Sequence, residues 1–369
     1  MTHSTVSTAT TSTHTSVELP TTMGLDLSDR VSHYHVQRGD GLTLATGKVA
    51  SLRDDLAALF EHWKGCRLVI EAGGHSPWIS RLGQECGMEV VVANPRRVEL
   101  ISKSDRKTDR TDAETLAELG RSNVRLLAPI THRSKEAQAD LGIKRARDAA
   151  VRVRTTLINH VRGVLKSNGH RAPGVSPECF GTRAAAAIPL ELAPALNPML
   201  RLIEQVNVQI KHFEQEMARL SKDRYPFTQL LKQISGIGLV VSLSYVLTLD
   251  DPKRFMRSRM VGAYVGLVPR KKSSGTRDPQ MHITKAGDGE MRRLLVLAAN
   301  HILGRFGPDC DLRRFGLRIV GNGTDRTAKK RARVAVARKL AVLMHHLWTT
   351  GEVYDPFYLA KKRGEPIPG

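Results

Sequence analysis

The pattern of apolar and polar positions predicts a β-rich first part of the chain. Apolar residues occur in short runs separated by polar or glycine-containing turns, a pattern typical of an antiparallel meander. Two later runs are almost entirely apolar, as in strands that are buried on both faces of a sheet. The predicted strands are residues 22–28, 31–37, 42–49, 66–72 and 88–95.

Helical spacing of apolar residues appears between and after these strands. Residues 51–64 predict a helix capped by Ser51, and a second helix covers about residues 77–86. A third begins near residue 109. Three strands followed by helix, strand, helix, strand and helix is the order of an RNase H-like domain. We therefore expect an α/β domain of this class at residues 21–130.

The remainder of the chain is predicted to be helical. One long helix covers residues 134–168, and a second runs to residue 222. Residues 169–198 between them are rich in Pro, Gly and Ala, which predicts a loop with short helical turns. We expect the long helices to form an antiparallel pair, a coiled-coil connector at residues 131–225. This pair is either a plain connector, a nucleic-acid-gripping arm or a dimerisation seam.

The spacing within the two long helices predicts which side chains form their seam. The first seam contains Val153, Leu157, Val161 and either Val164 or Leu165. The basic residues predicted to lie around that seam are Lys144, Arg145, Arg147, Arg152, Arg154, Arg162 and Lys166. The second seam contains Met199, Leu202, Val206, Ile210, Phe213, Met217 and Leu220.

Residues 226–350 predict a separate small α-rich domain. The turn ISGIG at residues 234–238 resembles that of a helix-hairpin-helix unit, where backbone N–H groups can face a phosphate; a tight turn without a ligand explains it equally well. The helix at residues 325–348 has a basic first half and an apolar face. Residues 1–20 are expected to be a disordered Thr- and Ser-rich tail, and residues 351–369 a C-terminal tail.

Charge is distributed unevenly along the chain. The net charge is +21, yet residues 1–130 contain 15 Lys and Arg against 16 Asp and Glu, while residues 131–369 contain 42 against 20. A cationic excess of this size favours nucleic acid as a partner, through phosphate contacts and counterion release. A membrane surface is the weaker alternative, because the basic segments lack bulky aromatic anchors.

Composition also argues against secretion and membrane insertion. No uninterrupted apolar run reaches the length of a membrane span, and the N-terminus lacks the pattern of a secretory signal. The 4 cysteines lie far apart and form no C-x-x-C pair, which is typical of free thiols rather than of disulfides or a zinc site. We expect a cytoplasmic protein without a membrane partner.

Four acidic residues occupy positions that suit a metal site. Asp109 and Asp112 share one face at the start of a predicted helix, where helix capping explains them somewhat better than metal binding. Asp26 lies in the first strand and Glu71 at the end of the fourth; each alone is equally well explained by solvent exposure. Together the four carboxylates match the set with which RNase H-like nucleases hold two divalent ions, and oxygen ligands suit Mg²⁺ or Mn²⁺.

A second candidate site is the sequence Ser273-Ser274-Gly275, which basic residues surround. A serine there could attack a phosphodiester, because the cations stabilise charge that develops on the phosphate. A histidine partner is not evident nearby, so a metal or an arginine would have to activate it; a polar turn is the commoner explanation. The basic residues expected to contact nucleic acid are Arg270, Lys271, Lys272, Lys285, Arg292, Arg293, Lys329, Lys330 and Arg333.

Six short motifs follow one another in a specific order between residues 22 and 350. They are GLDLS around Asp26, VIEAGG around Glu71, KTDRTDA around Asp109 and Asp112, SGIG, GAYVGLVPRKKSSGT and ITKAGDGEMRRLLVLAA. In this order the chain resembles the DEDD transposases of bacterial insertion sequences, in the group numbered one hundred and ten. That group is also described as bridge-RNA-guided recombinases.

The resemblance implies a RuvC-like N-terminal domain, a coiled-coil connector and a C-terminal transposase domain. It implies donor and target DNA, a structured bridge RNA, a homo-oligomer (dimer or tetramer) and a bacterial, nucleoid-associated location. The acids of the four motif positions would hold Mg²⁺. Ser274 would be the nucleophile that forms a 5′-phosphoserine link, with Ser273 as the alternative. Asp105 falls outside the family's D-x-x-D pair and is interpreted as a loop residue.

Three other functions stay open at the level of the sequence. A RuvC-like junction endonuclease would hydrolyse branched DNA with water and would leave no protein–DNA adduct. A non-catalytic RNA- or DNA-binding protein with a decayed nuclease domain is disfavoured by the intact acids. An actin-like ATPase is disfavoured because the chain lacks a Gly-rich phosphate loop and has a polycationic half.

Overall fold

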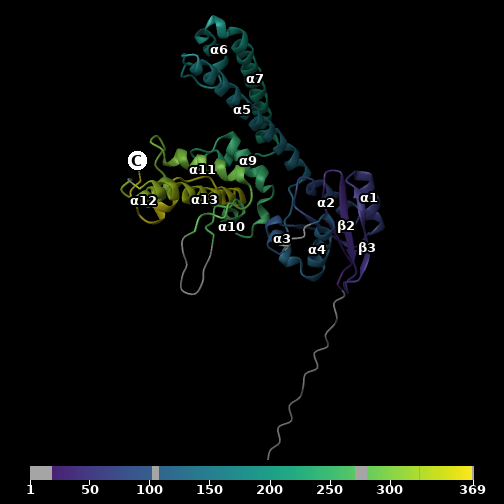
Figure 1. The fold of residues 1–369 in the computed structure, drawn as a ribbon. Coiled ribbons are helices and arrows are strands. Elements are labelled where there is room, and N and C mark those ends of the chain that lie inside the picture. The colour runs from purple at the N-terminus through teal and green to yellow at the C-terminus, as the bar shows by residue number, and fades with distance from the viewer. Residues whose placement is uncertain (1–18, 102–107, 271–280, 324, 368–369) are drawn as a thin grey trace, which may run out of the picture. The chain divides into compact units, whose positions relative to one another are not determined.

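A computed structural model describes residues 19–101, 108–270, 281–323 and 325–367 (Figure 1). The chain divides into two compact units, Met1–His132 and Arg133–Gly369. The predicted tail at residues 1–20 lies almost entirely outside the described residues.

The first unit contains a 5-stranded mixed sheet in the order β3-β2-β1-β4-β5. β1 pairs antiparallel with β2 and parallel with β4; β2 pairs antiparallel with β3, and β4 parallel with β5. The predicted strands are therefore confirmed. Their bounds are β1 (Thr22–Asp26), β2 (Val31–Gln37), β3 (Thr43–Ala50), β4 (Arg67–Glu71) and β5 (Glu89–Ala93).

Helices cover both faces of this sheet. They are α1 (Arg53–His62), α2 (Ser76–Glu85), α3 (Pro95–Ile101), α4 (Asp109–Ser122) and the 3-10 helix η1 (Val124–Leu127). Helix α3 was not predicted, and the predicted Ser51 cap of α1 is wrong. Leu52 precedes the helix without a side-chain cap, while the Ser51 hydroxyl lies 2.8 Å from that of Ser32.

Strand β4 is buried on both faces, as its apolar sequence predicted. Leu68 and Ile70 belong to the core that contains α1 and α2. Val69, which points the other way, belongs to a core with Leu116 of α4 and Leu127 of η1. The alternation of strand side chains thus places α1 and α2 on one face and α4 on the other.

Helix α4 lies directly on β1 at Gly24. A Cβ atom at this position would stand 2.0 Å from the carbonyl oxygen of Ala113 and 2.5 Å from the nitrogen of Ala117, both backbone atoms of α4. Only glycine permits this approach, which fixes the start of α4 over the end of β1.

We predict that Gly24→Ala destabilises the first unit by about 1–3 kcal/mol, the usual cost of overpacking. The backbone of α4 cannot yield to the new methyl group as a flexible side chain would. Urea unfolding of the whole chain, followed by circular dichroism, measures the effect. Gly74→Ala is the control, because a Cβ there meets nothing within 4 Å. Equal unfolding midpoints for the two variants would contradict the prediction.

The second unit contains two long antiparallel helices, α5 (Lys135–Ser167) and α7 (Ala193–Asp223), as predicted (Figure 1). Leu165 near the end of α5 packs with Leu196 near the start of α7, whereas Leu141 packs with Leu220 at the opposite ends. Between them lie α6 (Phe180–Ala184), η2 (Ala185–Ala187) and η3 (Leu190–Leu192).

The predicted seam of these helices is partly wrong. In α7 the seam is correct for Ile210, Met217 and Leu220, but nearer its start the buried residues are Leu196, Leu200 and Ile203. Leu202 is exposed there. In α5, Val153 is exposed and the next residue, Arg154, faces α7, where it donates to the Asn207 side chain at 2.9 Å. Val161 and Leu165 of α5 are buried as predicted, so the seam is shifted by one residue only toward Val153 and near the start of α7.

The remaining helices, apart from η4 and α14, share one apolar core. They are α8 (Phe227–Leu231), α9 (Leu239–Leu249), η4 (Pro252–Arg254), α10 (Arg259–Tyr264), α11 (Gly289–Leu303), α12 (Asp311–Val320), α13 (Arg326–Thr350) and α14 (Tyr358–Lys362). The predicted ISGIG turn connects α8 and α9, and α13 matches the predicted basic helix. Within the described residues, none of these helices has both the length and the apolar character that a membrane crossing requires.

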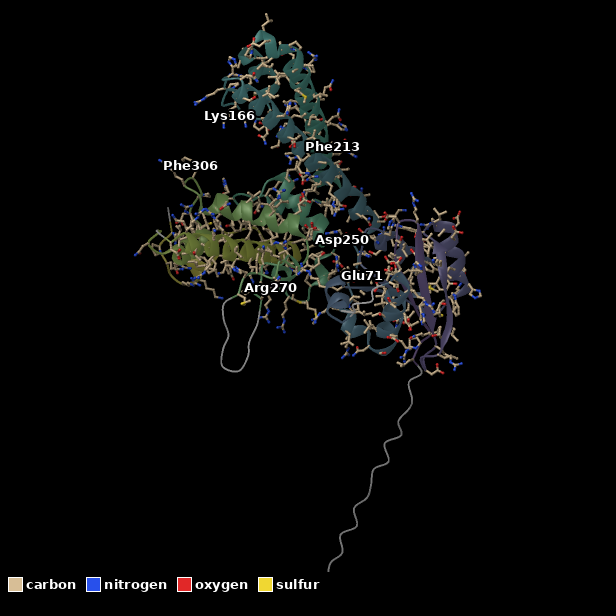
Figure 2. The ribbon with its side chains drawn as sticks, in the orientation of Figure 1. Glu71, Lys166, Phe213, Asp250, Arg270 and Phe306 are labelled. Carbon is tan, nitrogen blue, oxygen red and sulfur yellow. The ribbon has the colours of Figure 1, made fainter. Side chains whose placement is uncertain are left out.

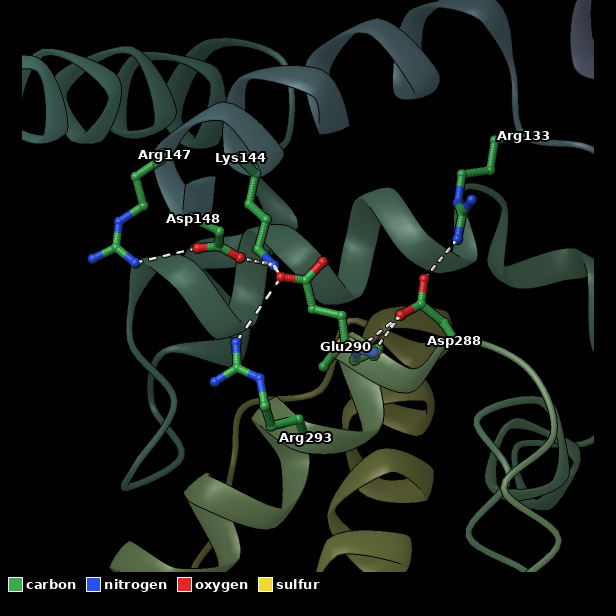
Figure 3. A network of polar contacts seen from close by, with 8 residues as sticks. Arg133, Lys144, Arg147, Asp148, Asp288, Glu290 and Arg293 are labelled. Carbon is green, nitrogen blue, oxygen red and sulfur yellow. Dashed lines mark hydrogen bonds and ion pairs between the residues drawn. The ribbon is translucent and has the colours of Figure 1, made fainter. Parts of the chain in front are cut away.

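A buried ionic cluster joins α5 to α11 (Figure 3). The Lys144 ammonium is 1% exposed and pairs with Asp148 at 2.8 Å and with Glu290 of α11. Burial by itself would raise the pKa of Asp148, but hydrogen bonds with Glu290 and Lys144 and the charge of Lys144 lower it to about 2. The hydrogen bond with Asp148, together with burial, raises the pKa of Glu290. Lys144, predicted to be one of the basic residues around the seam, is therefore buried in an ionic cluster.

Candidate functional site

The carboxyl ends of β1 and β4 bring Asp26 and Glu71 together. The strands are parallel with Leu25 opposite Ile70, and the next residue on each strand is its last, Asp26 and Glu71 (Glu71 is labelled in Figure 2). Residues in register on neighbouring strands point to the same face of a sheet. Both carboxylates are half-buried at the same edge.

Helix α4 covers this face and begins at this edge. Along the helix, Ala113 lies over Gly24, whereas Gly120 lies against Thr22 and Val69. The helix therefore runs opposite to β1, and its first turn lies toward the strand end that carries Asp26. Asp109 and Asp112 are in that first turn. All four predicted acids thus come from elements that end or begin at one edge of the sheet.

His33 on β2 is a residue of this edge that the sequence did not indicate. It pairs with Asp26 in the antiparallel register of β1 and β2, so it points to the face that α4 covers. Its Nδ1 lies 3.6 Å from Oδ2 of Asp109. This contact lies between strand β2 and the first turn of α4. Nothing in the run VSHYHVQ marks this histidine as part of the site, because its proximity to Asp26 and Asp109 depends on the register between β1 and β2.

Asp109 and Asp112 lie in the first turn of α4, as the capping interpretation expected, but neither is the N-cap. Thr108 is the N-cap of α4, and its side chain accepts a hydrogen bond from the backbone N–H of Thr111. The Thr111 hydroxyl in turn accepts from the backbone N–H of Thr108 at 2.9 Å, which completes a capping box. The two threonines supply the cap, so Asp109 and Asp112 are not needed for it. Asp105 lies outside the described residues.

The donor set at this edge suits a hard divalent cation, because it consists of carboxylate oxygens. Within the described residues, no 3 or more His, Cys, Asp or Glu side chains are close enough to hold a metal ion together. The chemistry of the residues fits the predicted ion, and their backbone positions place them around one edge.

The second predicted site lies next to two backbone hydrogen bonds in the second unit, which join residues 268–270 to residues 282–284. We call this pair of short segments the ladder. Ser273, Ser274, Lys271 and Lys272 lie outside the described residues. On either side of them, the backbone N–H of Arg270 donates to His282 at 2.9 Å, and that of Thr284 donates to Val268 at 2.8 Å. The chain therefore leaves and returns at neighbouring positions, and Figure 2 labels Arg270 there.

Arg292 holds this ladder in place. Its Nη1 donates to the carbonyl oxygens of Val265 at 2.9 Å and Ala286 at 3.0 Å, one on each side of the ladder. Gly287, with a φ of 69°, allows the second side to pack against the Tyr264 carbonyl. Arg292, predicted to contact nucleic acid, thus makes structural contacts at the base of the segment.

The other predicted cations lie on exposed surface. Arg293 is exposed and lies 4.0 Å from Glu290. Lys329, Lys330 and Arg333 are exposed on the first half of α13. Lys285 follows the ladder with a φ of 53°, a left-handed conformation that turns the chain toward α11.

Comparison with known protein families gives two matches along the chain. Residues 23–168 match a model of DEDD transposases of the IS110 type. Residues 228–313 match the model described as the transposase IS116/IS110/IS902 family. The first match contains the four acids, and the second contains the ladder and the segment between its sides.

Individual transposases are similar over most of the chain. The transposase for insertion sequence element IS1111A of Coxiella burnetii is 30% identical over 298 residues, which cover 79% of this chain and 79% of that protein. The transposase for insertion sequence element IS1328 of Yersinia enterocolitica is 30% identical over 287 residues, covering 76% and 83%.

Proposed function

Because the chain belongs to the IS116/IS110/IS902 family of transposases, we propose that it exchanges DNA strands with a carboxylate-bound metal and a serine nucleophile. It is the DNA transposase of an insertion sequence. The observation that carries the proposal is the common sheet edge at which Asp26, Glu71 and the first turn of α4 meet.

The first unit has the features expected of a RuvC-like, RNase H-like fold. Its strand order β3-β2-β1-β4-β5, with β1 antiparallel to β2 and parallel to β4, supports this assignment. We assign residues 21–130 to this domain, residues 131–225 to the connector and residues 226–350 to the transposase domain.

The acidic edge would hold Mg²⁺ or Mn²⁺ through Asp26, Glu71, Asp109 and Asp112. Such ions, when bound, stabilise charge on the attacking and leaving oxygens of a phosphoryl transfer. The contribution of the chain is to fix the four carboxylates on a sheet edge and a helix start. His33 supports Asp109 from the neighbouring strand.

Ser274 is proposed as the nucleophile on the strength of the family motif. Its oxygen would form a bond to phosphorus while the bond from phosphorus to the DNA 3′ oxygen breaks. The proton of the serine hydroxyl passes to the departing 3′ oxygen, and the DNA keeps its 5′ phosphate on the serine. Attack by a new 3′ hydroxyl reverses these steps and joins another strand, so no nucleoside triphosphate is needed.

The partners follow from charge and from the family. The excess of Lys and Arg beyond residue 130 supports binding of donor and target DNA. A structured bridge RNA and a homo-oligomer, a dimer or a tetramer, are proposed from the family resemblance. We place the protein in the bacterial cytoplasm, at the nucleoid.

The proposal predicts a covalent adduct with one end of a cut strand. Protein, Mg²⁺, the RNA of the element's non-coding end and donor DNA carrying the element's ends are mixed and then denatured. A label at the 3′ end of the cut strand should migrate with the protein, because the 5′ phosphate of that fragment is bound to serine. A label at the 5′ end should be released with a free 3′ hydroxyl.

Two variants decide which serine is used. Ser274→Ala should remove the adduct, whereas Ser273→Ala, the adjacent control, should retain it. Cut DNA without an adduct would show hydrolysis by water and would support a RuvC-like junction endonuclease in place of this proposal. An adduct that persists in Ser274→Ala but not in Ser273→Ala would move the nucleophile by one residue.

A further inference from the structure

The second unit contains a cleft of about 1400 Å³ that borders the ladder. One face of α13 forms its floor, from Thr327 to Leu347. At 1.5 Å per residue, this face extends for roughly 30 Å. The ladder and α12 contribute walls, together with the segment that leads into α14. The volume exceeds the roughly 300–1000 Å³ typical of small-molecule pockets, so its size fits a segment of a polymer.

The charges along the cleft are not balanced by its acids. Its three carboxylates already have partners: Asp311 accepts from the backbone N–H groups of Leu359 and Ala360, Asp355 pairs with Lys361, and Glu352 pairs with His346. The cations are more numerous. They are Arg259, Arg270, Lys285, Lys330, Arg331, Arg338 and Lys339.

Four of these cations come from α13 at helical spacing, in the pairs Lys330–Arg331 and Arg338–Lys339. Within the described part of the chain, none of the four forms an ion pair with a carboxylate. Lys339 lies 3.8 Å from the centroid of the Phe315 ring, and its pKa is lowered by burial and by the charges of Arg363 and Arg318. A phosphate group in the cleft would relieve this concentration of positive charge.

Apolar side chains line the cleft between the cations. Val334 and Leu343 of α13 and Phe315 of α12 are half-buried and face it. Tyr358 at the start of α14 is 60% exposed and offers an aromatic face. A double helix presents phosphates but keeps its base faces inside. An unpaired strand presents both, and proteins that bind such strands combine a cationic groove with aromatic and apolar platforms.

We propose that this cleft binds a single DNA strand, with its phosphates on the α13 cations and its bases on the apolar floor. The inference rests on the proposed function, because the cleft adjoins the ladder on both sides of the serine segment. The strand held there is the unpaired strand that continues from the phosphate under attack. The cleft would keep it separate from its complement until it is rejoined.

Binding of a fluorescein-labelled single-stranded oligodeoxynucleotide to the full chain tests this, with anisotropy as the readout and Ser274→Ala as the background. The cleft variant is Lys330→Gln with Arg331→Gln. The matched control is Lys253→Gln with Arg257→Gln, which removes the same charge from exposed positions of the same unit outside the cleft. Thermal unfolding verifies that both variants are folded.

The cleft variant should bind more weakly, and the slope of log K against log salt should fall by about 1.4, since each single-strand phosphate contact contributes roughly 0.7. The control variant should show the same slope of log K against log salt as the protein without these substitutions. Ala335→Trp, which fills the cleft without changing charge, should also weaken binding. The binding assays involve no cleavage, so they test the cleft independently of the adduct assay. Either the cleft assignment or the serine mechanism can therefore be contradicted while the other is supported.

Three results would overturn the assignment. The first is an equal loss of affinity in the control pair. The second is tighter binding of the matched duplex, or of the matched oligoribonucleotide, than of the single DNA strand. The third is full affinity in Ala335→Trp together with an unchanged salt slope in the cleft variant.

Discussion

Replacing Asp26 with Asn should abolish strand exchange and leave nucleic-acid affinity unchanged. Asp26 ends β1 beside Glu71 on β4, and the amide keeps the shape of the side chain while it removes the negative charge that a divalent cation requires. We expect a fall in recombination rate on the order of 10²–10³-fold or more, comparable with the loss of a group that stabilises a transition state. Counting of joined DNA products measures the rate.

Asp54→Asn on α1 is the matched control, because it makes the same chemical change on an exposed helix of the opposite sheet face. Titration calorimetry with Mn²⁺ provides a second readout that does not depend on catalysis. Weaker Mn²⁺ binding in Asp26→Asn, but not in Asp54→Asn, is expected. Normal recombination by Asp26→Asn would remove this carboxylate from the mechanism.

Lys144→Met is expected to lower the free energy of unfolding of the second unit by about 3–5 kcal/mol, the usual cost of removing one partner from a buried ion pair. The substitution leaves Asp148 and Glu290 facing each other without the cation that now lies between them. Packing changes little, because Met has nearly the length of Lys. Guanidinium unfolding measures the loss, and Lys166→Met near the exposed end of α5 is the control.

Lowering the pH should reduce the difference in free energy of unfolding between Lys144→Met and the natural protein. The folded pKa of Asp148 is about 2, below its ordinary value of 3.8, so its contribution to stability is present above pH 4 and is lost as pH falls toward 2. In the variant this carboxylate loses the charge that lowers its pKa and takes up a proton at higher pH. A difference that grows as pH falls from 5 to 3 would contradict this account.

The sequence by itself determined the local structure of this protein. Short apolar runs separated by polar or glycine-containing turns predicted the strands of the first unit, and the apolar run of β4 correctly indicated burial on both faces. The long helices and the basic helix α13 also followed from spacing. These features depend on neighbours within a few positions, which is the range over which side chains share a face of a helix or strand.

The tertiary structure decided which side chains meet. His33 is beside Asp109 only because β1 and β2 pair in one register, and a shift of one residue would turn it to the other face. Lys144 has the sequence context of a surface lysine, yet it is fully buried because two carboxylates from α5 and α11 offset its desolvation. Such contacts join residues far apart in the chain, so no local pattern contains them.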